Sequence, residues 1–147
     1  MHMKDSAYQE LASLFFSTRQ IIRSRLPESA ADPNAWLHFQ TMRFIADSDT
    51  PTMQDVAAYL RIKAPSATSL IGYLADKGFI SRLTGDRDKR VTRLALSARG
   101  KRVLAEHQKR SNTTLRTVFS QFDQAEVREL ARILRHLRDM HDSSMRR

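Results

Sequence analysis

Hydrophobic residues recur at every third or fourth position along most of the chain, a period typical of amphipathic helices. The spacing predicts helices over 6–26, 34–46, 65–77, 98–120 and 124–141, with a short helix after Thr52. After Gly78 the period changes to two, which predicts a β-hairpin over 80–96 with a long charged tip. The expected fold is therefore mainly α-helical with a small β-hairpin.

Residues that favour helix ends support several of these boundaries. Thr52 with Asp55 resembles a capping box, and Asp123 with Glu126 forms a second pair of the same kind. Gly78 follows the fourth predicted helix, where glycine tolerates the left-handed conformation of a helix C-cap. These residues predict where three of the helices begin or end.

Two helices joined by a tight turn around 61–64 and followed at once by a hairpin form the pattern of a winged helix-turn-helix. The second helix of such a pair fits the major groove of DNA, while the hairpin, or wing, reaches the phosphates or the adjacent minor groove. We therefore predict a winged helix-turn-helix region over 33–97.

The first helix and the last two carry apolar stripes longer than so small a region can cover. We therefore predict a helical dimerisation region over 5–30 and 98–147, with a homodimer as the assembly. The alternative is a monomer whose terminal helices fold back on its own core. The side chains expected in the dimer interface are Leu11, Leu14, Leu115, Phe119, Leu130, Leu134 and Leu137.

Positive charge is concentrated around the predicted winged region. The 147 residues carry 25 Lys and Arg against 16 Asp and Glu, a formal net charge of +9. Between Arg61 and Arg102, eleven cations stand against three anions, so eight of the nine net charges lie in this segment. Cations that neutralise phosphates release counterions and so favour binding to DNA. A double-stranded DNA partner is predicted, and the alternative is a generally basic surface.

The candidate DNA-contacting residues lie on the second helix of the pair and in the hairpin tip. On the helix they fall outside the apolar stripe, and an ordinary polar face is the alternative. In the tip, an acid that accepts a hydrogen bond from a neighbouring Arg would aim another Arg into a narrow minor groove, whereas the alternative is a solvated turn. The candidates are Lys63, Ser66, Thr68, Ser69, Tyr73, Arg87, Asp88, Lys89 and Arg90.

Five segments together resemble the multiple-antibiotic-resistance regulator (MarR) family. They are TMQDVAAYL at 52–60, APSATSLI at 64–71, LADKGFISR at 74–82, DKR at 88–90 and LALSARG at 94–100. The resemblance implies a homodimeric transcriptional regulator, usually a repressor, whose first, fifth and sixth helices form the dimer core. A dimer with two winged regions would contact half-sites about 34 Å apart and prefer a pseudo-palindromic site.

The resemblance also assigns roles to individual residues. The wing acid and the arginine that enters the minor groove fall on Asp88 and Arg90. The chain departs from the family pattern at three positions. Lys63 stands where a Ser cap is frequent, and Ser69 where a long polar side chain is frequent. Gly72 interrupts the second helix of the pair, the recognition helix. These departures leave the operator sequence open.

MarR-like proteins commonly release DNA when a small, often aromatic or phenolic, acid binds between the dimer core and the winged region. By this resemblance, residues of the first two predicted helices could line such a cleft; each is alternatively an ordinary core or surface residue. The candidates are Phe15, Arg19, Trp36, His38, Phe39 and Met42.

Other function classes find little support in the sequence. The chain has no cysteine, which excludes thiol redox sensing and thiolate metal sites. The five histidines lack paired metal spacing, and no phosphate-binding loop or nucleophile motif is present, so no cofactor, metal or enzymatic activity is expected. Without a long apolar run, no membrane association and a cytoplasmic location are expected. The competing functions are a nonspecific architectural DNA binder and a winged-helix protein-interaction module.

Overall fold

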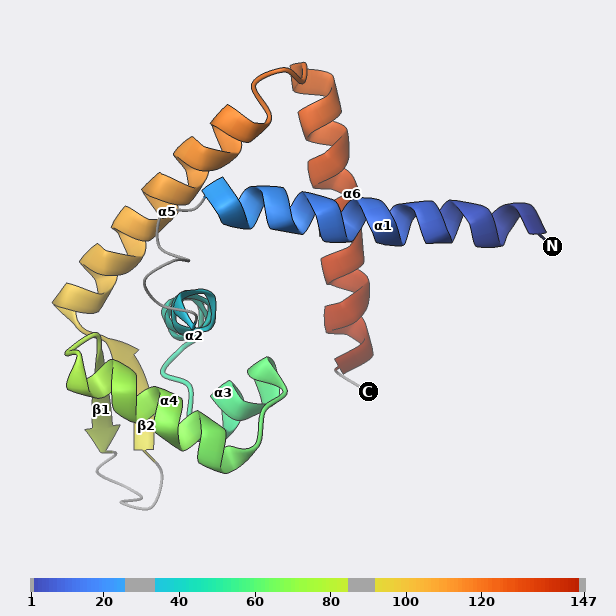
Figure 1. Ribbon diagram of the computed structural model, residues 1–147. Coiled ribbons are helices and arrows are strands. Elements are labelled where there is room, and N and C mark those ends of the chain that lie inside the picture. The colour runs from blue at the N-terminus through green and yellow to red at the C-terminus, as the bar shows by residue number, and fades with distance from the viewer. Residues whose placement is uncertain (1, 26–33, 85–91, 146–147) are drawn as a thin grey trace. The chain divides into compact units, whose positions relative to one another are not determined.

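The computed structural model describes residues 2–25, 34–84 and 92–145. Its elements in chain order (Figure 1) are α1 (His2–Arg25), α2 (Ala35–Asp47), α3 (Met53–Leu60), α4 (Ala64–Asp76), β1 (Ile80–Thr84), β2 (Thr92–Leu96), α5 (Ala98–Val118) and α6 (Gln124–Met145). The chain divides into two compact units, Met1–Ser111 and Asn112–Arg147. This mainly helical fold with one small hairpin confirms the predicted fold class.

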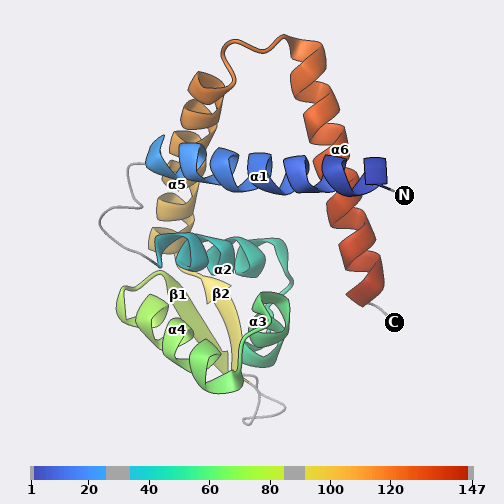
Figure 2. The same cartoon turned by 45° about the vertical axis from the view of Figure 1, so that its right-hand side comes forward.

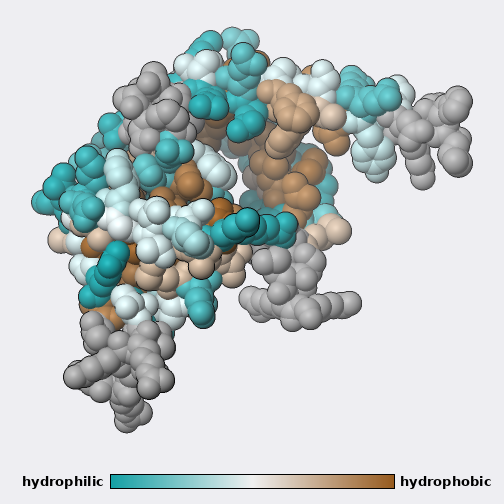
Figure 3. All heavy atoms as spheres, turned by 60° about the horizontal axis from the view of Figure 1, so that its bottom comes forward, coloured by the Kyte–Doolittle hydropathy of each residue, from teal (hydrophilic) through white to brown (hydrophobic). Residues whose placement is uncertain are grey.

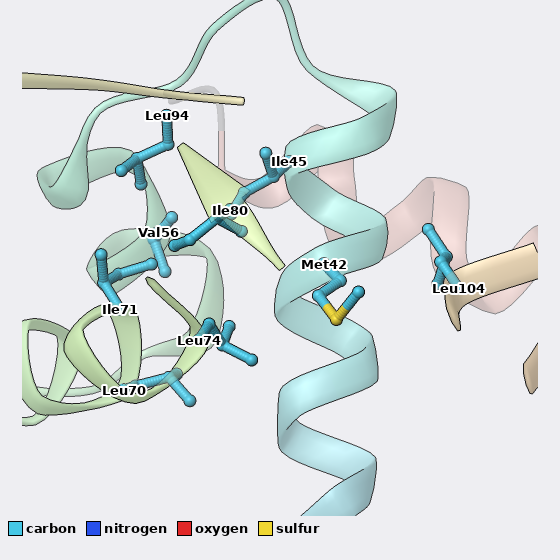
Figure 4. Packing of buried hydrophobic residues seen from close by; sticks show 9 residues of the cluster. All are labelled: Met42, Ile45, Val56, Leu70, Ile71, Leu74, Ile80, Leu94 and Leu104. Carbon is cyan, nitrogen blue, oxygen red and sulfur yellow. The ribbon is translucent and has the colours of Figure 1, made fainter. Parts of the chain in front are cut away.

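Residues 35–97, called the head below, close around a hydrophobic core. Val56, Ile71, Leu74 and Leu94 are fully buried there, so α3, α4 and β2 each contribute to its centre. Figure 4 shows these side chains converging with those of α2 and β1. The other members of this core cluster are Met42, Ile45, Leu70, Ile80 and Leu104 of α5.

The helix-turn-helix pair begins at the predicted capping box, which the structure confirms. The Thr52 side-chain oxygen accepts from the Asp55 amide at 3.2 Å, and the Thr52 amide donates to the Asp55 carboxylate at 2.7 Å. The Thr52 amide and, to a smaller extent, the Thr52 hydroxyl donate to this carboxylate and hold the pKa of Asp55 below its ordinary value of 3.8. Arg61, with φ of 54°, ends α3 in the left-handed conformation and directs the chain into α4.

The junction between α4 and the hairpin depends on two glycines. Gly78 has φ of 72°, which confirms the predicted left-handed turn, and Ser97 donates its hydroxyl to the Gly78 carbonyl at 2.6 Å. The same Ser97 oxygen accepts from the Gly100 amide at 2.9 Å, so Ser97 caps α5. A Cβ atom at Gly100 would overlap the Phe79 carbonyl, so this close approach requires glycine.

The hairpin pairs β1 with β2 in antiparallel register, from Ile80 opposite Leu96 to Thr84 opposite Thr92. The opposite edge of β2 pairs with the residues just before α3. There the Leu94 amide donates to the Pro51 carbonyl at 2.8 Å, and Thr52 forms a bridge with Arg93. Figure 2 shows the hairpin lying between α4 and α3, so the wing strands are fixed to both helices of the pair.

The terminal helices are longer than the sequence pattern predicted. The expected start of α1 at residue 6 is wrong, because the helix begins at His2; Met3 and Lys4 are good helix formers, and neither glycine nor proline interrupts them. The α6 helix continues beyond the expected end near 141 to Met145. Its start agrees with the second predicted capping pair, since Asp123 Oδ1 accepts from the Glu126 amide at 2.9 Å and the Glu126 carboxylate accepts from the Asp123 amide.

Candidate nucleic-acid interface

The predicted recognition helix, α4, presents one polar face to solvent. Ser66, Thr68 and Ser69 are exposed on it, Tyr73 is 41% exposed, and Lys63 stands exposed just before the helix begins. The spacing of Ser66, Ser69 and Tyr73 places these three on one side of the helix. The opposite side is buried and consists of Ala67, Leu70, Ile71 and Leu74.

The hydroxyl protons of two residues on this face are used within the helix. Thr68 donates to the Ala64 carbonyl at 3.0 Å, and Ser69 donates to the Pro65 carbonyl at 3.1 Å. A carbonyl oxygen can only accept, so each hydroxyl presents lone pairs to solvent in this arrangement. In a major groove these oxygens would match amino groups, which adenine and cytosine carry.

Tyr73 does not stand alone on the face. Its ring stacks on the His38 ring of α2, with centroids 4.4 Å apart and planes 20° apart, and Lys77 Nζ lies 5.5 Å from the same ring centroid. From the sequence, Tyr73 is expected among the DNA contacts and His38 among the ligand contacts. The structure brings these two residues together, so the outer face of α4 is joined to α2 through a ring stack.

The predicted wing-tip contacts Arg87, Asp88, Lys89 and Arg90 lie outside the described residues. The structure does describe the strands on either side, with β1 ending at Thr84 and β2 beginning at Thr92.

A contact at the base of the wing was not predicted from the sequence. Arg93 of β2 donates through a guanidinium nitrogen to the Thr50 carbonyl at 3.1 Å. Thr50 has φ of 46°, an unfavourable conformation for a β-branched residue, which costs of order 1–3 kcal/mol. In the sequence Arg93 is only one of the clustered cations. The one available signal was Thr50-Pro51 before the capping box, a pair that favours a turn.

The residues predicted to line a ligand cleft have different surroundings. Met42 is 1% exposed within the core, and Phe39 stacks on His107 of α5 with centroids 3.4 Å apart. Met42 and Phe39 therefore pack as ordinary core residues in this structure, which is the alternative to a ligand contact. Trp36 is 71% exposed on α2, and Phe15 and Arg19 are exposed on α1.

The predicted dimer residues lie on α1, α5 and α6, except Phe119, which follows the end of α5, and most are exposed. Leu137 is 63% exposed and Leu11 60%, whereas Phe119 is half-buried beside Phe122. Figure 3 shows uncovered hydrophobic surface in brown. Polar pairs occupy another part of α6, where Arg132 contacts Glu129 at 2.7 Å. The remaining predicted interface residues with exposed side chains are Leu14, Leu115, Leu130 and Leu134.

Membrane-spanning helices and metal-binding clusters are absent from the described residues. No helix in these ranges is both long and apolar enough to span a membrane. Within the same ranges, no three His, Asp or Glu side chains gather into a set that would hold a metal ion.

A capped helix pair, an exposed polar face on its second helix and an antiparallel hairpin fixed to both helices define a winged helix-turn-helix protein. The model of the MarR family matches residues 33–91, which include both helices of the pair and the first strand of the hairpin. The winged helix-turn-helix region is therefore similar in sequence to that of MarR family proteins. No curated protein matches the chain by sequence.

Solved structures share the fold over nearly the whole chain. A MarR family protein from Bacillus stearothermophilus has a TM-score of 0.78 and 20% identity, covering 94% of this chain and 97% of that one. FabT of Streptococcus pneumoniae in complex with DNA has a TM-score of 0.70 and 18% identity, covering 95% and 98%. Wild-type MarR from E. coli in its apo form has a TM-score of 0.68 and 20% identity, covering 86% and 96%. Identities this low establish similarity of fold.

Proposed function

We propose that the protein is a homodimeric, sequence-specific regulator of transcription that binds double-stranded DNA. The observation that carries this proposal is the exposed polar face of α4 inside the segment that holds eight of the nine net positive charges. A recognition helix requires a face that is free of core packing, and phosphate binding requires nearby cations. FabT, which has the same fold, is described in complex with DNA, and this supports the same partner here.

The homodimer is argued from the terminal helices. Six large apolar side chains of α6, Val127, Leu130, Ile133, Leu134, Leu137 and Met140, are exposed. A monomeric protein rarely leaves so many apolar side chains in contact with water, and a second copy offers an identical surface for them. Two heads held by such a pair would contact two half-sites, so we propose a pseudo-palindromic operator.

Repression and its release by a small aromatic or phenolic acid form the regulatory part of the proposal. Their support is the family resemblance, together with the exposed Trp36, Phe15 and Arg19 near the start of the chain.

A protein that regulates transcription acts where the chromosome lies, and we accordingly place it in the cytoplasm.

The proposal is tested by selecting bound duplexes from a random library and titrating the protein against the selected duplex and a scrambled one of equal length. We expect the selected duplex to bind at least about 1,000-fold more tightly at physiological salt. Affinity should fall steeply between about 50 and 200 mM salt, because each phosphate contact releases a counterion. Equal affinity for both duplexes, or a flat salt dependence, would contradict sequence-specific binding.

A nonspecific architectural DNA binder is the second candidate. The observation that favours it is the absence of Arg, Asn or Gln from α4, since these residues make the bidentate contacts that distinguish bases most strongly. Recovery of unrelated duplexes from the same selection, all bound with similar affinity, would support this candidate.

A further inference from the structure

Arg93 joins a strand of the wing to the residues that precede the helix pair. Its backbone lies in β2, one strand of the wing, and its side chain reaches the Thr50 carbonyl, 43 residues earlier in the chain. The adjacent backbone pairs the same two segments, through the Leu94 amide on the Pro51 carbonyl. Side chain and backbone therefore fix one strand of the wing to the residues that start α3.

The accepting residue is held in an unfavourable conformation. Thr50 has φ of 46° although it precedes Pro51, and a following proline restricts a residue to extended conformations. A strained backbone of this kind persists only where surrounding contacts fix it. The hydrogen bond from Arg93 is a contact of this type, because it orients the Thr50 carbonyl toward β2.

We propose that Arg93 is a positioning residue that sets the direction in which the wing leaves the helix-turn-helix, by fixing the Thr50 carbonyl to strand β2. The inference rests on the proposed function, since the wing needs a fixed direction only if it contacts DNA. The competing role for Arg93 is a direct phosphate contact, like that expected of a cation elsewhere in the winged region. The two roles predict different behaviour of the same variants.

The first experiment uses the full-length protein without DNA and follows amide hydrogen exchange by NMR. In Arg93→Gln the Leu94 amide, which donates to Pro51, is expected to exchange about tenfold faster or more, because the contact beside it is lost. The Ser97 amide, bonded to the Phe79 carbonyl at the other end of the hairpin, is the internal control and is expected to be unchanged. Arg82→Gln, on β1, removes an equal charge and should leave both amides as they are.

Two exchange results would overturn the proposal. An unchanged Leu94 amide would show that Arg93 does not hold the two segments together. Equal acceleration at Leu94 and Ser97 would show that Arg93 contributes only to global stability.

The second experiment measures operator binding in a double-mutant cycle with the predicted wing-tip contact Arg90. Arg93→Gln should weaken binding about tenfold in the wild-type chain, but less than about twofold in an Arg90→Ala chain, where the wing contact is already lost. Arg93→Lys retains the charge but not the planar guanidinium, so it should weaken binding as Arg93→Gln does. Arg82→Gln should have the same effect in both chains.

Wild-type affinity in Arg93→Lys would overturn the proposal, because charge alone would then be sufficient. The proposal would also be overturned if Arg93→Gln weakened operator binding equally in the wild-type chain and in the Arg90→Ala chain. Failure of the unaltered protein to bind any selected duplex would refute the proposed function and the role of a directed wing with it. The exchange experiment would still report separately whether Arg93 holds Thr50 to the hairpin.

Discussion

The head and the terminal helices place their apolar side chains in opposite environments. In the head, Val56, Ile71 and Leu74 are completely buried, and the exposed face of α4 is polar. On α1 and α6, by contrast, Leu11 and Leu137 remain mostly exposed. The head therefore supplies most of a hydrophobic core and presents polar groups to solvent. The terminal helices present apolar groups, which are suited to pairing with a second copy.

The largest expected effect comes from placing a charge on the apolar face of α6. Leu134→Glu should weaken dimerisation by several kcal/mol, because an interface would have to bury an unpaired carboxylate. Light scattering over a concentration series should then give the monomer mass. Arg135→Glu, one residue further on the same helix, is the matched control and should remain dimeric. An intact dimer in Leu134→Glu would remove α6 from the proposed interface.

The second effect concerns a predicted DNA contact of the head. Arg90→Ala should weaken binding of the selected duplex by about 1–3 kcal/mol at fixed salt, because the resemblance places this arginine in the minor groove. Fluorescence anisotropy titration measures the change. Arg19→Ala on α1 removes one positive charge outside the head and should alter the affinity far less. Equal affinities for Arg90→Ala and wild type would exclude Arg90 as a contact.

A substitution at Gly72 is expected to raise the stability of the head and to weaken its binding to DNA. A Cβ atom added there would meet no atom within 4 Å beyond its chain neighbours and the backbone of its own helix, so Gly72→Ala should raise the free energy of unfolding by about 1 kcal/mol through helix propensity. Helical geometry places position 72 on the outer side of α4, and the added methyl group should therefore weaken operator binding. Thermal unfolding and DNA titration measure the two effects. A variant that is more stable and binds as well as wild type would show that this position does not approach DNA.

The capping box offers the smallest effect, and it depends on pH. The pKa of Asp55 is lowered in the folded protein, so its contribution is present above the unfolded pKa and is lost as the pH falls through the folded pKa. Stability should therefore decline below pH 3.8 by a few tenths of a kcal/mol more in the wild type than in Asp55→Asn, because the carboxylate is solvent-screened. Urea denaturation at pH 7 and pH 3 measures this, with Thr52→Ser as a control that keeps the cap hydroxyl. Identical pH dependence in Asp55→Asn would contradict this role.

Local patterns predicted most of the fold because helix caps and hydrophobic periods act over a few residues. The capping box at Thr52 and the left-handed turn at Gly78 are confirmed for this reason. The start of α1 was misplaced because Asp5 and Ser6 favour a cap, whereas the chain before them also favours helix. The exposed face of α4 follows from the helical period of its apolar residues.

The remaining parts of the site depend on contacts between distant residues. Arg93 meets Thr50 across a separation of 43 residues, and His38 of α2 stacks on Tyr73 of α4. No local period or capping rule relates such pairs, so they emerge only when the head is folded. The wing-tip and dimer assignments remain predictions that the experiments above address.

A footprint on the selected duplex tests most directly whether paired terminal helices carry two identical heads to DNA. We expect two protected segments centred about 34 Å apart on one face of the duplex, with two protomers bound. Leu134→Glu should lose this paired pattern while retaining the fold of the head. Uniform protection along the duplex, or a single protected segment with one bound protomer, would contradict the account.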